Sequence, residues 1–130
     1  MSDAKISALL AGTPASPAVA HLVFLKLKPS SDAAVIFEQL RSLKAQVPGM
    51  LSFAGGANTN PEGLSRGYTH SFCMHFVDAA ARDAYLPHPD HERVKALILQ
   101  NVEPEGACVM DFDLPPSYFT SASVASLSMQ

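Results

Sequence analysis

The sequence of 130 residues has few cysteines, few charged residues and no long apolar stretch. Two cysteines, Cys73 and Cys108, are too few for a disulfide scaffold in a chain this short. No run of lysine and arginine occurs and the formal net charge is -3, so the basic surface of a nucleic-acid-binding protein is missing. No segment approaches the ~20 apolar residues that a membrane-spanning helix needs. We therefore expect a cytoplasmic globular protein with two buried thiols that binds neither nucleic acid nor membrane.

The two ends of the chain differ in composition from its middle. Residues 1–19 are rich in Ala, Ser and Pro and are interpreted as an N-terminal arm, and residues 115–130, rich in Ser, Ala and Thr, as a C-terminal tail. Apolar residues in the tail suggest that it docks on the domain or on a partner subunit. A secretory signal is the alternative for the arm, because Ala18–Ala20 resembles a cleavage site, but the preceding apolar run is short. Residues 20–114 are expected to form a single domain.

The domain contains segments typical of strands and helices in an ordered series. β-branched and aromatic residues indicate the strands, and apolar residues at three- and four-residue steps indicate the first helix. Strands are expected over 20–28, 50–57, 68–77 and 107–114, helices over 33–46, 78–85 and 89–99, and a turn over 101–106. This order, β-α-β-β-α-β with prolines interrupting the second helix, is the ferredoxin-like motif. It predicts an α+β fold with a four-stranded antiparallel sheet in the order 4-1-3-2 and the helices on one face.

Alternation along the strands places apolar side chains on both faces of this sheet. One face lies under the helices. The other carries Leu22, Phe24, Cys73, Val77, Cys108, Met110, Phe112 and Leu114. Because no helix is expected there, a second copy packed sheet to sheet would cover it, which predicts a homodimer forming a dimeric α+β barrel. The alternative is that the C-terminal tail covers this face. Two glycines in the second strand, Gly55 and Gly56, indicate a bulge or a close backbone approach.

Histidines, a tyrosine and an aspartate are expected on the face that the helices cover. A histidine near a helix N-terminus, such as His88 or His91, is favoured as neutral imidazole, which can act as a base or a metal ligand. Asp111 lies near the start of the first strand and could orient a histidine and fix its tautomer. The predicted catalytic residues are Tyr85, His91 and Asp111. The predicted pocket residues are His21, Val23, Leu25, His70, Phe72, His88 and Val109.

The same residues also allow simpler interpretations. The His88-Pro-x-His91 pattern is often a capping and packing device, and a strand histidine is often a satisfied core residue. A zinc site from His88, His91 and a third histidine is disfavoured, because zinc-binding helix pairs more commonly use i, i+4 spacing. We therefore expect no metal and no cofactor. His75 has the opposite parity to His21 and His70, so no catalytic role is predicted for it.

An ordered set of short motifs resembles a known family. The set comprises His21–Lys26, Pro48-Gly49, Gly67–His70, Tyr85-x-x-His88-Pro-x-His91 and Asp111-Phe112. Together these residues resemble the stress-responsive A/B-barrel (Dabb) family over about residues 20–114. The resemblance implies a dimeric α+β barrel. It also implies that Tyr85 and His91 match the catalytic tyrosine and histidine of a characterised relative, the plant polyketide cyclase olivetolic acid cyclase, which performs an intramolecular aldol condensation.

Three functions follow as hypotheses. In the first, a pocket between sheet and helices binds a small carbonyl compound or supports cyclase-like proton transfer, with Tyr85 polarising the carbonyl and His91, oriented by Asp111, moving the proton. In the second, the protein is a non-catalytic, stable dimeric stress protein with structural histidines. In the third, the fold carries a heme or metal site, as other dimeric α+β barrels do.

Overall fold

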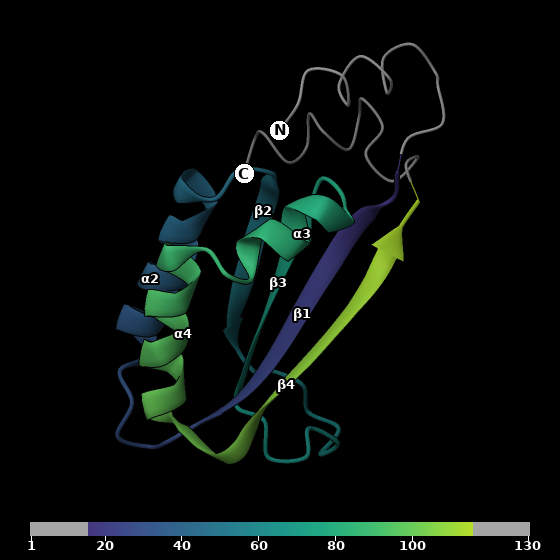
Figure 1. The fold of residues 1–130 in the computed structure, drawn as a ribbon. Helices are drawn as coiled ribbons and strands as arrows, with labels where there is room; N and C mark the ends of the chain where they lie inside the picture. Colours follow the sequence, from purple (N-terminus) through teal and green to yellow (C-terminus); the bar gives the residue numbers. More distant parts are fainter. Residues whose placement is uncertain (1–15, 116–130) are drawn as a thin grey trace.

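The computed structural model describes residues 16–115, which form a four-stranded sheet covered by helices on one face (Figure 1). The elements are β1 (Ala18–Leu27), α2 (Ala33–Gln46), β2 (Met50–Ala57), β3 (His70–Phe76), α3 (Ala79–Tyr85), α4 (Pro89–Asn101) and β4 (Val102–Leu114). The strand order is β2-β3-β1-β4 and every neighbouring pair is antiparallel, so the predicted order is confirmed. Apart from a few residues next to the sheet, the expected arm and tail lie outside the described residues.

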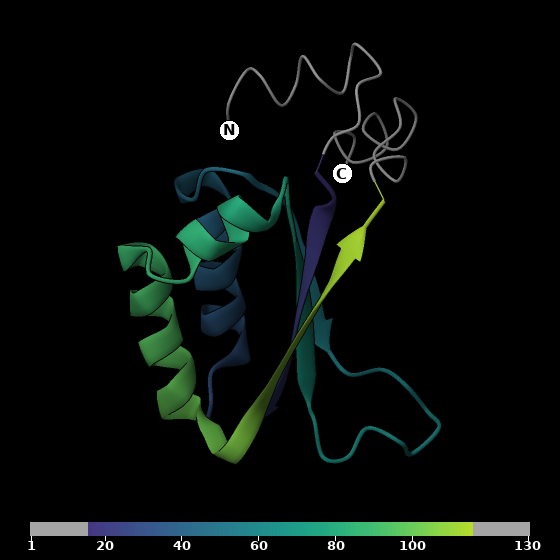
Figure 2. The ribbon, with the colours of Figure 1, turned by 45° about the vertical axis from the view of Figure 1, so that its right-hand side comes forward.

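All three helices lie on the same side of the sheet (Figure 2). Side chains at the helix starts satisfy backbone N–H groups that have no partner within the helix. Asp32 accepts from the Val35 amide at α2, and Asp78 accepts from the Ala81 amide at α3. At α4 the cap is the His88 imidazole, followed by a proline in the first turn. Helices α2 and α4 therefore begin at the predicted residues, and α3 begins one residue later than predicted, after its cap Asp78.

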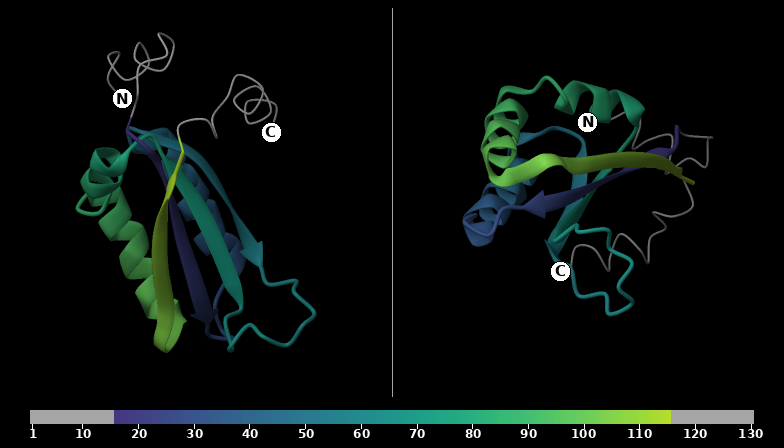
Figure 3. Two further views of the ribbon diagram at one scale, coloured as in Figure 1. Left: turned by 90° about the vertical axis from the view of Figure 1, so that its right-hand side faces the viewer. Right: turned by 90° about the horizontal axis from the view of Figure 1, so that it is seen from below.

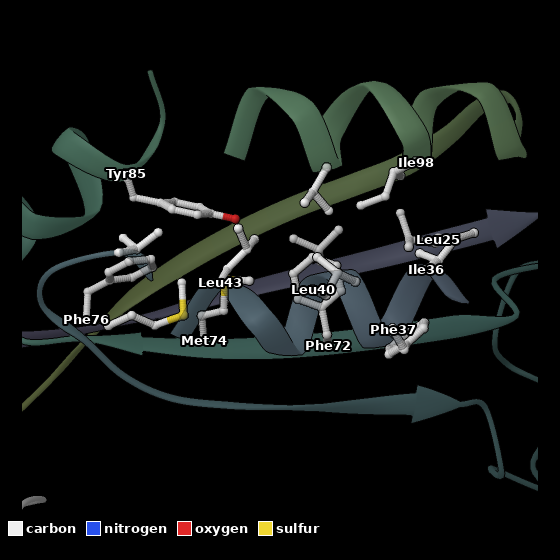
Figure 4. Packing of buried hydrophobic residues seen from close by; sticks show 14 of the residues in the cluster. Leu25, Ile36, Phe37, Leu40, Leu43, Phe72, Met74, Phe76, Tyr85 and Ile98 are labelled. Carbon is white, nitrogen blue, oxygen red and sulfur yellow. The ribbon is translucent and has the colours of Figure 1, made fainter. Parts of the chain in front are cut away.

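The largest buried side chains gather between the helices and the sheet (Figure 4). They come from the two inner strands, β1 and β3, and from all three helices, and include Leu25, Ile36, Leu40, Leu43, Met74, Phe76, Tyr85 and Val94. The opposite face of the sheet carries no helix within residues 16–115, and there Met110 and Phe112 are 63% and 52% exposed. Two further views show β4 at one edge of the sheet and the β2–β3 loop extending beyond its end (Figure 3).

Two local features of the strands refine the predictions. The segment 101–106 was expected to be a turn, but β4 begins at Val102, because the chain bends within an irregular strand. The β1–β4 register shifts between Leu25 and Leu27, and Glu105 has a φ of 57°. This left-handed residue allows the strand to change direction without ending.

The paired glycines of β2 differ from each other in their surroundings. A Cβ atom at Gly55 would lie 2.5 Å from the Phe72 Cβ and 2.7 Å from the Ser71 carbonyl oxygen. A Cβ atom at Gly56 would meet nothing within 4 Å. Close backbone approach is therefore the role of Gly55, and the register shift of this strand lies elsewhere, between Met50 and Ser52.

Candidate functional site

A cavity of about 270 Å³ lies between the sheet and the helices. Most of its lining is apolar: His21, Val23, Leu25, Leu40, Phe72, Tyr85, Leu86, His91, Val94, Lys95, Ile98, Leu99, Ala107 and Val109. Leu99 on α4 and Val109 on β4 are each 56% exposed, so the cavity opens to solvent between this helix and the edge strand. The cavity therefore combines apolar walls with a small set of polar groups, as small-molecule sites do.

Tyr85, the last residue of α3, places a hydroxyl group in this interior. The residue is 1% exposed, and its ring packs against His91, Phe76 and His21 at centroid distances of 4.2, 5.1 and 5.9 Å. Figure 4 shows the hydroxyl directed into the space between α4 and the sheet. Within residues 16–115 no group hydrogen-bonds to it, although its oxygen is not fully occluded. Burial raises the pKa of Tyr85, so the phenol stays protonated at neutral pH and can donate a hydrogen bond to a ligand.

His91, in the first turn of α4, offers the complementary group. Its Nδ1 lies 2.7 Å from the Leu86 carbonyl oxygen. A carbonyl oxygen can only accept, so Nδ1 carries the proton and Nε2 of the neutral ring holds a lone pair. Burial lowers the pKa of His91, which keeps the imidazole neutral at pH 7. A neutral imidazole with an unused Nε2 is suited to accept a proton.

Asp111 holds a different histidine from the one that the sequence predicted. His21 and Asp111 are direct partners across β1 and β4, and the His21 Nδ1 lies 2.8 Å from the Asp111 Oδ1. The other carboxylate oxygen accepts from the Arg82 guanidinium at 2.9 Å. The prediction that Asp111 orients His91 is therefore wrong, because the Leu86 carbonyl holds His91 and the carboxylate faces His21.

The fold agrees with a comparison against protein families. The model of the Stress responsive A/B Barrel Domain (Dabb) matches residues 19–114. The chain belongs to the Dabb family. No curated protein matches this sequence. The family resemblance noted in the sequence is thus confirmed.

Solved structures of similar proteins support the same fold. A dimeric ferredoxin-like protein of unknown function from Jannaschia sp. is 30% identical, with a TM-score of 0.67, 75% of this chain covered and 99% of that chain. A Dabb family protein from Mesorhizobium loti is 24% identical, with a TM-score of 0.61 and coverages of 75% and 96%. The hydroxynitrile lyase from Passiflora edulis is 20% identical, with a TM-score of 0.67 and coverages of 75% and 94%, and at this identity the likeness shows the fold alone.

Two of the predicted pocket residues of this Dabb domain do not line the cavity. His70 has the predicted parity, but it lies four residues along β3 from Met74, the partner of His21, which is roughly 13 Å in an extended strand. There it contacts Phe37 and hydrogen-bonds to the neighbouring threonine. His88 caps α4, its Nδ1 accepting from the Asp90 amide at 3.1 Å. The other predicted pocket residues, His21, Val23, Leu25, Phe72 and Val109, all line the cavity.

The structure brings together the predicted pair Tyr85 and His91, but the groups that support this pair were not predicted from the sequence. Tyr85 and His91 lie side by side although a helix break separates them. Arg82 was not singled out, yet it stands three residues before Tyr85 and so on a similar side of α3, which is a signal that could have been used. The Leu86 carbonyl has no such signal, because every residue carries one. Within residues 16–115 no group of three or more His, Cys, Asp or Glu residues could hold a metal ion, and no helix is long and apolar enough to cross a membrane.

Proposed function

We propose that this Dabb domain binds a small carbonyl compound in the cavity and transfers a proton at the carbon next to the carbonyl group. The observation that carries this proposal is the pairing of an unpartnered Tyr85 hydroxyl with the unused Nε2 of His91 in an apolar cavity. One group can donate and the other can accept, which is what enolisation of a carbonyl compound requires.

In the proposed reaction the Tyr85 hydroxyl donates a hydrogen bond to the carbonyl oxygen of the substrate. His91 Nε2 takes the proton from the adjacent carbon, the electrons of the C–H bond form an enolate, and His91 becomes an imidazolium ion. The Tyr85 hydrogen bond stabilises the charge that develops on oxygen, and the apolar walls strengthen this effect. The imidazolium exchanges its proton with solvent, and His91 then protonates the enolate carbon, so that the neutral imidazole is regenerated.

The dimensions of the cavity limit the size of the substrate. Sites for drug-sized ligands usually measure about 300–1,000 Å³. The cavity, at about 270 Å³, lies just below this range. It therefore suits a small compound with one aromatic ring or a short aliphatic chain, and we use acetophenone as the probe.

Proton exchange tests the proposal directly. Acetophenone is incubated in D₂O with the protein, and loss of its methyl proton signal is followed by NMR. His91→Asn keeps an N–H group that can face the Leu86 carbonyl but removes the base, and Tyr85→Phe removes only the hydroxyl. Each variant should lower the exchange rate by about 10²–10⁴-fold.

The control variant is His88→Asn, because asparagine also caps helices and His88 does not line the cavity. It should leave the rate unchanged. An exchange rate in the presence of wild-type protein no higher than in buffer would refute the proposal, as would an unchanged rate for His91→Asn.

We further propose that the chain forms a homodimer through the sheet face opposite the helices. The exposure of Met110 and Phe112 supports this assembly, since contiguous exposed apolar side chains are typical of interaction surfaces. The Jannaschia relative is described as dimeric. A cytoplasmic location is proposed as well, which the two free thiols of Cys73 and Cys108 support.

A further inference from the structure

A chain of three side chains leads from the surface of α3 to the cavity. The Arg82 Nη1 lies 2.9 Å from the Asp111 Oδ2, and the Asp111 Oδ1 lies 2.8 Å from the His21 Nδ1. The side chains are 25%, 21% and 7% exposed in that order, so burial increases toward the cavity. Because His21 lines the cavity, this chain connects a surface cation with the interior of the site.

The carboxylate of Asp111 determines which nitrogen of His21 carries the proton. An ionised carboxylate only accepts hydrogen bonds, so the His21 Nδ1 carries a proton toward it. In the neutral form of the ring, Nε2 then holds a lone pair, and within residues 16–115 it makes no hydrogen bond. Among the described residues that line the cavity, Tyr85 thus offers its hydroxyl as a donor, and His21 and His91 each offer an Nε2 acceptor.

Arg82 holds the carboxylate in place. Its guanidinium contacts the oxygen of Asp111 that does not face His21, so both oxygens are engaged and the carboxylate cannot rotate freely. Arg82 has a second partner, Asp83, at 2.8 Å from its Nε. This exposed residue lies outside the cavity and supplies a matched control.

We propose that Arg82 is a positioning residue that acts through Asp111 to keep His21 as a second acceptor, so that the cavity prefers small carbonyl compounds that also carry a hydroxyl group. This inference rests on the proposed function for its ligand class. The carbonyl oxygen accepts from Tyr85, and the hydroxyl donates to the Nε2 of His21. Such a ligand satisfies groups that a simple ketone leaves unpaired, and unpaired polar groups in an apolar site lower affinity.

The experiment compares two probes that differ by one oxygen atom, 2-hydroxyacetophenone and acetophenone. Affinities are measured by NMR titration for the wild type, Arg82→Gln, Arg82→Lys and Asp83→Asn. The wild type and Asp83→Asn should bind the hydroxyketone about fivefold more tightly, which corresponds to one net hydrogen bond of about 1 kcal/mol. Arg82→Gln should lose this preference, and Arg82→Lys should restore part of it because the cation is retained.

A second measurement reads the His21 tautomer directly from the ¹⁵N shifts of its imidazole, in folded protein and without ligand. The wild type and Asp83→Asn should show a single Nδ1–H form, and Arg82→Gln a mixture of both tautomers. An unchanged tautomer and an unchanged hydroxyl preference in Arg82→Gln would overturn the positioning role. Equal affinities of the wild type for the two probes would overturn the ligand class. If neither probe binds, the proposed function fails together with the ligand class, and the tautomer measurement still decides the role of Arg82.

Discussion

The Tyr85→Phe substitution tests whether the Tyr85 hydroxyl contributes to the stability of the fold or only to function. The Tyr85 ring is 1% exposed and packs against three other rings, so it contributes to the core. Its hydroxyl makes no hydrogen bond within residues 16–115. Tyr85→Phe keeps the ring contacts and removes only the polar atom, so folding should not depend on the change.

The expected magnitude follows from the surroundings of the hydroxyl. Burial of an unpaired hydroxyl costs about 1–3 kcal/mol in protein mutational data. Because the Tyr85 oxygen borders the cavity and is not fully occluded, we expect the lower end: a gain in the free energy of unfolding of 0 to about 1 kcal/mol. Tyr85→Ala, which also removes the ring, should instead lose about 3–5 kcal/mol.

The measurement is urea unfolding followed by far-UV circular dichroism, at one fixed protein concentration because a dimer would make stability depend on concentration. Tyr85→Phe should unfold at the same or a higher urea concentration than the wild type. A loss of more than about 1 kcal/mol would refute the reasoning, since it would mean that the hydroxyl has a structural partner.

Three further predictions concern stability and assembly. Burial lowers the pKa of His91 below its usual 6.5, so the unfolded chain takes up this proton at a higher pH than the folded protein does. The free energy of unfolding should therefore fall as the pH drops below about 7, until the folded-state pKa is passed, in urea titrations between pH 4 and 8. His91→Asn should reduce this slope, and His75, whose pKa burial also lowers, should account for part of the slope that remains. Phe112→Glu should weaken the proposed dimer by more than about tenfold in sedimentation experiments, because it buries an unpaired charge; an unchanged dimer would exclude this face. Gly55→Ala should lower the free energy of unfolding by about 1–3 kcal/mol, and Gly56→Ala by less than about 0.5 kcal/mol, because only the first Cβ meets backbone; similar losses in both would contradict the packing described.

The alternation of side chains was enough to predict the sheet and its two faces. Parity placed His21 and Asp111 on the helix face, and antiparallel pairing then made them neighbours. Parity does not give the distance along a strand, and for that reason His70 was placed in the pocket although it lies farther along β3. The irregular start of β4 was also missed, because glutamate is not a residue type that indicates the positive φ that Glu105 adopts.

The helix break after Tyr85 explains why the contact between Tyr85 and His91 was predicted and why the hydrogen-bond partner of His91 was not. Prolines indicated the break, and a break is what brings His91 back over the ring of Tyr85. The partner of His91 could not be predicted, because a backbone carbonyl at Leu86 depends on the path of the chain and not on the side chain. For that reason the sequence analysis assigned the Asp111 carboxylate to His91, whereas it contacts His21.

His21 and His91 differ in how readily a substitution elsewhere in the chain can alter their tautomers. His91 receives its tautomer from a main-chain carbonyl, and no single side-chain replacement at position 86 deletes that atom. His21 depends on two side chains, Asp111 and Arg82, and one substitution at either position removes its support. A lineage that inherits this domain can keep the proton acceptor on α4 while it gains or loses the one on β1, and ligand preference can diverge on an unchanged scaffold.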